Sequence, residues 1–155
     1  MLVFATSAHA LNAGGWEVDA APDKDSDCTL QKSYKDTNGG DASIAVLFAK
    51  NDNTHALGMV LAVGYEKWAF DKDQKQAADL VIDDTVEQRG VEWIAGAKDA
   101  LRWVIFKPDP ILQSISQGKT MSLRFDGNKD GASTFDIANL GQALAAAIPC
   151  VSQMK

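Results

Sequence analysis

Residues 42–49 read ASIAVLFA, and residues 56–63 read ALGMVLAV. The polar residues 50–53 between them have the composition of a tight turn. Continuous apolar runs of this length, bounded by turn residues, are typical of strands in the interior of a sheet. The two runs therefore predict a β-hairpin that is buried on both faces, or nearly so.

Shorter segments on both sides of this hairpin also have strand patterns. Apolar and polar residues alternate, or form short apolar runs, in residues 16–19, 28–34, 65–70, 80–83, 101–106, 120–125 and 133–137. Residues 71–78 are polar and predict a short helical turn. Residues 86–100 predict a strand followed by a loop around Gly96.

Two helices are predicted late in the chain. Asp109 is suited to cap the first one, with Pro110 in its first turn and Gly118 at its end. The second is predicted over residues 139–148, where apolar residues recur at helical spacing and Pro149 marks the end.

Many strands with short connections favour antiparallel pairing. We therefore predict a mainly β, antiparallel, β-sandwich-like fold with two short helices late in the chain; an α+β fold is the alternative. No repeat or linker divides the sequence, so residues 11–155 are predicted to form a single globular domain.

The first ten residues, MLVFATSAHA, have an apolar run and small residues at the −3 and −1 positions of a signal-peptidase site. Residues 1–10 are therefore predicted to be the remnant of a signal peptide, with Leu11 as the first mature residue. The alternative is a short buried strand. An exported protein would be periplasmic or secreted, and no apolar run reaches the ~20 residues of a membrane span.

The chain has two cysteines, Cys28 and Cys150, too few for a four-thiolate zinc site. In an oxidising compartment they are expected to pair, closing nearly the whole domain into one loop. The alternative is two free, buried thiols.

The net charge of −6 argues against nucleic acid as a partner. His55 is the only histidine after residue 10, and no nucleophile-elbow motif is present, so no catalytic residue and no cofactor is predicted. At least two of the tryptophans at positions 16, 68, 93 and 103 are expected in the core.

Residues 126–131, DGNKDG, match the first half of a calcium-binding loop, with oxygen ligands at Asp126, Asn128 and Asp130. Position 12 of such a loop would be Ile137, where a glutamate belongs. A hairpin loop explains the same residues, so calcium binding is an alternative hypothesis and no metal is predicted.

Acidic residues also allow a hydrolase as an alternative. Asp83 and Asp84 follow a predicted strand, and Glu87 and Glu92 are close in sequence. Hydrolysis of a glycoside needs two carboxyl groups held across a cleft. Paired aspartates at a strand end are also common turn residues.

The order of these features resembles small periplasmic proteins of Gram-negative bacteria similar to the invasion-associated locus B family, and also certain accessory lipoproteins of type VI secretion. The resemblance rests on Trp16 before Cys28, the strand 81–83 ending in aspartate, the segments 111–125 and 134–137, and a last helix that ends near Cys150.

This resemblance implies a β-sandwich-like envelope protein without known catalytic residues. We therefore expect a non-catalytic exported protein that acts as a binding or interaction module. Its partner is an unidentified protein or envelope component.

Overall fold

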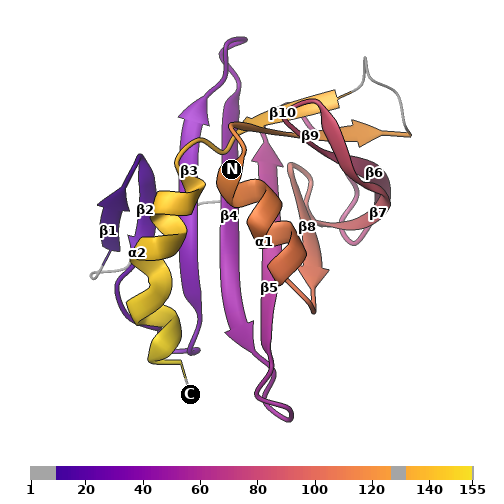
Figure 1. The fold of residues 1–155 in the computed structure, drawn as a ribbon. Helices are drawn as coiled ribbons and strands as arrows, with labels where there is room; N and C mark the ends of the chain where they lie inside the picture. Colours follow the sequence, from indigo (N-terminus) through magenta and orange to yellow (C-terminus); the bar gives the residue numbers. More distant parts are fainter. Residues whose placement is uncertain (1–9, 127–131, 155) are drawn as a thin grey trace.

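The computed structural model describes residues 10–126 and 132–154. Within them, ten strands form one open sheet, and two helices lie on one of its faces (Figure 1). The elements are β1 (Ala10–Ala13), β2 (Trp16–Asp19), β3 (Cys28–Lys35), β4 (Asp41–Lys50), β5 (Leu57–Tyr65), β6 (Lys75–Ile82), β7 (Thr85–Ala97), β8 (Ala100–Ile105), α1 (Asp109–Gln117), β9 (Thr120–Phe125), β10 (Ala132–Asp136) and α2 (Leu140–Ser152).

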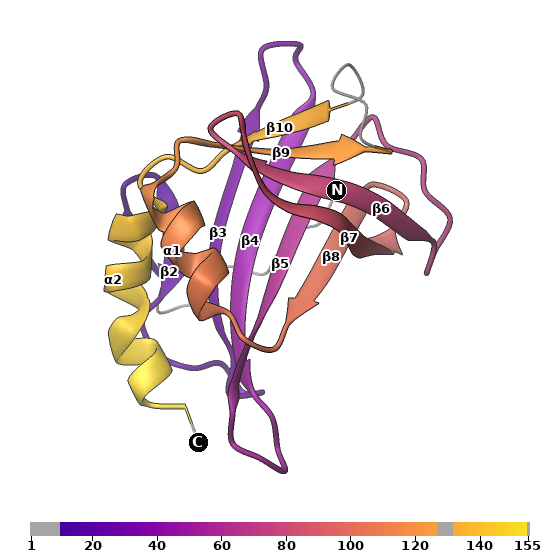
Figure 2. The same ribbon diagram turned by 45° about the vertical axis from the view of Figure 1, so that its right-hand side comes forward.

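The strands lie in the order β1-β2-β3-β4-β5-β8-β7-β6-β9-β10, and the pairs are antiparallel. The sheet curls strongly, so that β9 and β10 cross beside the upper ends of β3 and β4 (Figure 2). The predicted mainly β, antiparallel fold with two late helices is confirmed. The two layers of its sandwich-like arrangement belong to one continuous sheet.

The hairpin predicted from residues 42–49 and 56–63 is formed by β4 and β5, with Val46 opposite Leu61. Its two faces differ: the expected burial on both faces, or nearly so, is complete on the inner face and partial on the other. Ile44, Val46 and Leu61 point into the core and are at most 1% exposed, whereas side chains such as Leu47 on the other face are only partly covered. The helices and the curled end of the sheet cover one face only.

The core lies between the inner face of the sheet and the helices. Trp16 and Trp93 are fully buried there, which confirms the expectation for two of the tryptophans. The two helices approach closely at Gly141, where a Cβ atom would lie 2.8 Å from the carbonyl oxygen of Ser116. Glycine at this position allows the helices to meet.

The middle of the chain differs from the sequence prediction. β5 ends at Tyr65, and residues 66–74 form turns rather than a continued strand. A strand, β6, occupies the second half of the segment predicted as a helical turn, because it pairs with β7 on one side and β9 on the other. β7 continues through Gly96, where the register shift against β8 marks a bulge instead of a loop.

The ends of both helices differ from those predicted. α1 has Pro108 rather than Asp109 at its N-cap. α2 does not end at Pro149 but continues to Ser152, so the proline lies inside the helix. Asn139 is left-handed, with φ of 64°, and its side-chain amide donates to the Gly14 carbonyl instead of capping α2.

Neither helix in the described part of the chain has the length and apolar character needed to cross a bilayer. The predicted signal segment, residues 1–10, lies outside the described residues except for Ala10, the first residue of β1.

Candidate functional site

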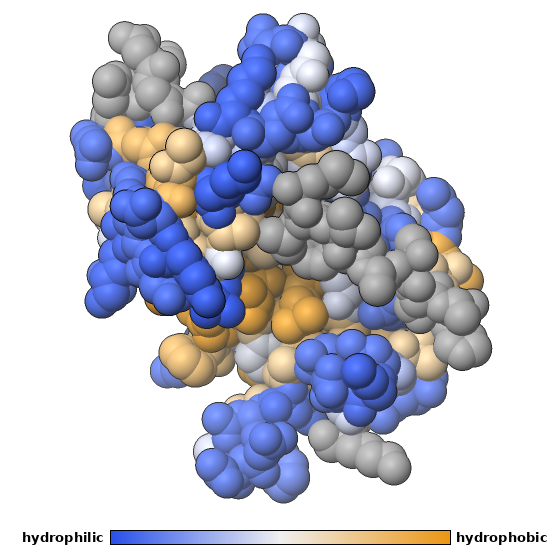
Figure 3. Space-filling view, turned by 180° about the vertical axis from the view of Figure 1, so that it is seen from behind, coloured by the Kyte–Doolittle hydropathy of each residue, from blue (hydrophilic) through white to orange (hydrophobic). Residues whose placement is uncertain are grey.

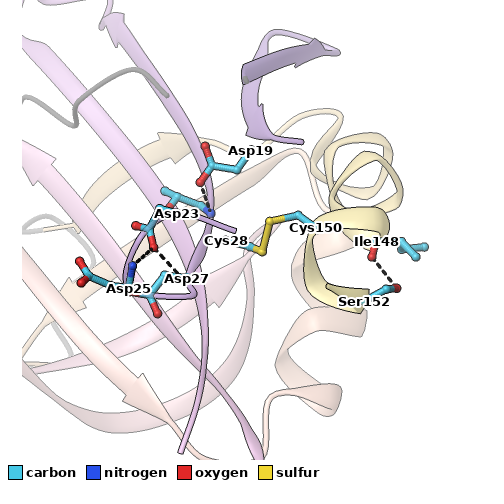
Figure 4. The surroundings of a disulfide bond; sticks show 9 residues. Asp19, Asp23, Asp25, Asp27, Cys28, Ile148, Cys150 and Ser152 are labelled. Carbon is cyan, nitrogen blue, oxygen red and sulfur yellow. Dashed lines mark hydrogen bonds between the residues drawn. A yellow bond between two sulfur atoms is a disulfide. The ribbon is translucent and has the colours of Figure 1, made fainter. Parts of the chain in front are cut away.

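The two predicted cysteines form a disulfide that joins β3 to α2 (Figure 4). The sulfur atoms are 2.00 Å apart and the Cα atoms 6.1 Å apart, and both residues are fully buried. The bond closes a loop over a sequence separation of 122. It fastens the last helix to the sheet.

Three aspartates, at positions 23, 25 and 27, lie in the loop that precedes Cys28, and Asp19 ends β2 next to it (Figure 4). The Asp23 carboxylate accepts hydrogen bonds from the backbone N–H groups of Asp25 and Asp27, so it stabilises the turn. Burial raises the pKa of Asp27, and the neighbouring aspartates raise it further. Burial also raises the pKa of Asp19, whose carboxylate accepts from the Thr29 N–H. The carboxylates of Asp23 and Asp19 therefore act as hydrogen-bond acceptors that fix the backbone of the β2–β3 loop.

Two acidic residues of the hydrolase hypothesis, Asp83 and Glu92, lie far apart in the structure. Asp83 lies in the β6–β7 turn, where one carboxylate oxygen accepts from the N–H groups of Thr120 and Lys119, which lowers its pKa. Glu92 pairs with Lys75 near the other end of β6, five residue positions along the strand from the turn. That separation is roughly 17 Å, beyond the ~5–10 Å between the carboxyl groups of glycosidases.

The calcium hypothesis cannot be placed in the structure, because Asn128 and Asp130 lie outside the described residues. Asp126 is exposed at the end of β9, with φ of 51°. His55 is exposed in the β4–β5 turn, with φ of 57°, as expected for a turn residue.

A polar cleft of about 500 Å³ opens between the β3–β4 hairpin and the β9–β10 hairpin. We call it the tyrosine cleft, since Tyr34 and Tyr65 contribute to its wall. Its lining residues are Tyr34, Lys35, Asp36, Thr37, Asn38, Ala42, Tyr65, Thr120, Ser133, Thr134, Phe135 and Asp136. No local motif links these positions, because three separate parts of the chain supply them.

Two hydroxyl groups of the tyrosine cleft are held by donors from the protein. The Tyr34 hydroxyl oxygen accepts from the Asp136 N–H at 2.8 Å, and the Ser133 oxygen accepts from the Trp68 indole N–H at 3.3 Å. A hydroxyl that accepts in this way keeps its own proton for donation. Both side chains line the cleft, so they can offer these protons to a ligand.

The carboxylates of the tyrosine cleft are engaged in the fold. Asp36 accepts from the Tyr65 hydroxyl and from the N–H groups of Gly40 and Asn38, and these bonds lower its pKa. Burial opposes ionisation of Asp136, but hydrogen bonds from Lys32 and the Ala138 N–H outweigh it and lower the pKa. A cationic ligand would have to displace these partners.

An apolar hollow of about 590 Å³ lies between the two helices, and we call it the helix groove. α1 and α2 meet near Gly141 and separate toward their other ends (Figure 1). The lining residues are Phe48, Leu57, Leu112, Gln113, Ser116, Gly141, Leu144, Ala145, Ala147, Ile148, Val151 and Ser152. Ile148 is 61% exposed.

The opposite face of the sheet carries a second apolar area (Figure 3). Val104 is 46% exposed and Phe106 80% exposed; Val104 pairs with Val60 on β5, and Arg102 points to the same side of β8. This area is formed by side chains on a sheet surface, whereas the helix groove is a hollow between two helices.

The sequence matches no model of a known protein family, and no curated protein matches it. Among solved structures, the fold is similar to the crystal structure of invasion associated protein B from Bartonella henselae. The TM-score is 0.51 at 12% sequence identity, and the match covers 90% of this chain and 95% of that one. The resemblance to the invasion-associated locus B family therefore holds for the fold.

Proposed function

We propose that this protein is a non-catalytic, exported binding module of the cell envelope. Its ligand is an uncharged, hydroxyl-rich envelope component, such as a neutral saccharide, held in the tyrosine cleft. One observation carries the proposal. Tyr34 and Ser133 are fixed by hydrogen bonds that they accept, and each retains a proton for a ligand oxygen.

The charge around the tyrosine cleft supports an uncharged ligand. Asp36 and Asp136 have lowered pKa values, so they are ionised at neutral pH and repel anions. Lys35 is paired with Asp41 at 2.7 Å, which leaves it less able to attract an anion. The remaining polar groups of the lining are largely hydroxyls and an amide, which suit a neutral ligand.

Export is supported by the buried disulfide, since such bonds persist in the periplasm and outside the cell. The fold of an invasion-associated protein agrees with a place in the envelope. A binding role without catalysis is supported by the engagement of both cleft carboxylates. His55 lies beyond the other end of β4, away from the tyrosine cleft.

The test is a titration of the isotope-labelled protein with chitotriose, followed by backbone amide chemical shifts. We expect shifts concentrated in residues 34–38, 65 and 133–136, with the oligosaccharide recovered intact. The double variant Tyr34→Phe/Ser133→Ala should bind roughly thirtyfold more weakly, because two hydrogen bonds of about 1 kcal/mol each are lost.

Ser114→Ala is the matched control, since it removes an exposed hydroxyl on α1 outside the cleft. Its affinity for chitotriose should equal that of the parent. A panel of neutral oligosaccharides that leaves the cleft resonances unmoved at millimolar concentration would overturn the ligand class. Shortened sugar products would overturn the non-catalytic role.

A further inference from the structure

We propose that Tyr65 determines the specificity of the tyrosine cleft, because its hydroxyl oxygen accepts a hydrogen bond from a hydroxyl group of the ligand. This inference rests on the proposed function. It narrows the ligand to a saccharide whose contacted hydroxyl group is unsubstituted. Gly40 and Asp36 are the positioning residues that hold Tyr65 for this contact.

The ring of Tyr65 is fixed by the backbone of the β3–β4 turn. A Cβ atom at Gly40 would lie 2.6 Å from Cε2 of Tyr65 and 2.8 Å from its hydroxyl oxygen, so a side chain at position 40 would displace the ring. Trp68 also meets the ring edge-to-face, with the ring centres 6.1 Å apart. Tyr65 is half-buried and lines the tyrosine cleft in this fixed position.

The hydroxyl proton of Tyr65 is used within the protein. Tyr65 donates it to the Asp36 carboxylate, which also accepts from the Gly40 N–H at 2.7 Å and the Asn38 N–H at 2.9 Å. The bond to Asp36 raises the pKa of Tyr65 and lowers the pKa of Asp36, so at neutral pH the tyrosine is protonated and the aspartate is ionised. A hydroxyl whose proton is committed in this way still accepts through its oxygen lone pairs.

Tyr65 therefore has the opposite hydrogen-bonding role to two other hydroxyl groups of the cleft. Tyr34 and Ser133 accept from the protein and keep their protons, whereas Tyr65 donates to the protein and can accept. Trp68 connects the two kinds, since its ring contacts Tyr65 and its indole N–H donates to Ser133. A ligand hydroxyl can both accept and donate, but an ether or carbonyl oxygen can only accept and would leave Tyr65 without a ligand donor.

Chemical-shift titrations with chitotriose, and with analogues in which fluorine replaces one hydroxyl group at a time, test the proposal. Carbon-bound fluorine has no proton to donate. At least one analogue should bind the parent about fivefold more weakly than chitotriose, which is the effect of one lost hydrogen bond. Tyr65→Phe should bind chitotriose about fivefold more weakly than the parent does, and it should bind that analogue and chitotriose equally.

Gly40→Ala tests the positioning of Tyr65. The added methyl group should displace the ring and weaken chitotriose binding. In the Tyr65→Ala background, where no ring can be displaced, the same substitution should leave the affinity almost unchanged. An equal loss in both backgrounds would overturn the positioning role of Gly40. Circular dichroism and the mass of the intact disulfide-bonded chain check that the variants fold.

Ser114→Ala is again the matched control, because it removes an exposed hydroxyl outside the cleft. It should keep the affinity of the parent and its discrimination against the fluorinated analogue. If Tyr65→Phe binds chitotriose as tightly as the parent, or discriminates against the same analogue as strongly, the role of Tyr65 is overturned and the proposed function stands. A parent that binds neither chitotriose nor any other neutral oligosaccharide would overturn both.

Discussion

Lys32 connects the inner face of β3 to the segment that leads into α2. Its ammonium nitrogen lies 2.9 Å from an Asp136 carboxylate oxygen and 5.9 Å from the centre of the Trp16 ring. The Trp16 indole N–H in turn donates to the Ala138 carbonyl at 2.9 Å. The lysine side chain is 14% exposed, so its charge is stabilised by these neighbours rather than by bulk water.

Lys32→Met should lower the free energy of unfolding by about 1–2 kcal/mol at pH 7, because Asp136 loses its cationic partner. The magnitude is moderate since the Asp136 side chain is 47% exposed and water partly replaces the lysine. Urea unfolding measures the change. Lys35→Met is the control, because its pair with Asp41 is exposed and its loss should leave the free energy of unfolding almost unchanged.

The pH dependence of this loss has a definite sign. The pKa of Asp136 is lowered in the folded protein, so its stabilising effect is complete above the ordinary aspartate value of 3.8. The effect disappears as the pH falls through the lowered folded pKa. The stability difference between the parent and Lys32→Met should therefore shrink below about pH 4. An equal difference at pH 2.5 and pH 7 would contradict this assignment.

At the residue scale, the sequence identifies the cysteine pair and the buried tryptophans, because composition and position restrict what they can do. It did not identify Lys32. Strand alternation from Cys28 through Leu30 places Lys32 on the inner face, and a lysine there indicates a buried partner. Its partner Asp136 is 104 residues away, so only the fold shows which residue it is.

The β6–β7 turn shows how short elements constrain their residues. Asp83 and Asp84 have φ of 46° and 65°, the left-handed conformation at both central positions of a tight hairpin turn. Asp84→Gly should raise the free energy of unfolding by about 0.5–1 kcal/mol, because glycine adopts this conformation without steric cost. The midpoint temperature of thermal unfolding, compared between the parent and Asp84→Gly, measures this gain.

Gly90→Asp is the reverse control for this turn prediction. Gly90 has φ of 60°, and a Cβ atom there would meet nothing within 4 Å, so the cost of aspartate is conformational. That variant should be less stable than the parent. A loss of stability in Asp84→Gly would contradict the prediction. It would mean that the Asp84 side chain stabilises the folded protein by more than its left-handed backbone conformation destabilises it.

Pro149 interrupts the hydrogen bonding of α2, since proline has no N–H to donate to the preceding turn. Pro149→Ala should stabilise the protein by roughly 1 kcal/mol or more, because the missing bond is restored at an exposed position. The midpoint of urea unfolding reports this gain. Pro110→Ala, in the first turn of α1, should bring no such gain because proline is tolerated there.

Element prediction from the sequence succeeds where the local pattern and the tertiary contacts agree, as in β4, β5 and α1. It fails in the first half of β6, residues 75–78, where lysine, glutamine and two alanines favour a strand only weakly. Pairing with β7 and β9 decides the conformation of these residues. Such long-range partners cannot be read from a local window.

For the whole molecule, antiparallel pairing followed from the short connections, but the strand order did not. β8 lies between β5 and β7, and β6 joins β9, so the sheet does not follow sequence order. The tyrosine cleft arises from the curl of this sheet, which brings β10, the last strand in the order, beside the β3–β4 hairpin. No motif marks the cleft for the same reason.

The disulfide should make a large contribution to global stability. Cys28→Ala/Cys150→Ala should lower the free energy of unfolding by about 4–5 kcal/mol, because the bond closes a loop of more than 100 residues in the unfolded chain. Urea unfolding of the parent with and without reductant should give a similar difference. A loss below 1 kcal/mol would show that loop closure contributes little.

The same disulfide also determines how the protein can mature. With two cysteines in the whole sequence, a single intramolecular bridge can form, so an oxidant suffices and no isomerase has to correct wrong pairings. Cys28 must remain a thiol until Cys150, 122 positions later, has been synthesised. Covalent closure is therefore a late step in maturation, and a protease cut in the loop would leave both fragments attached.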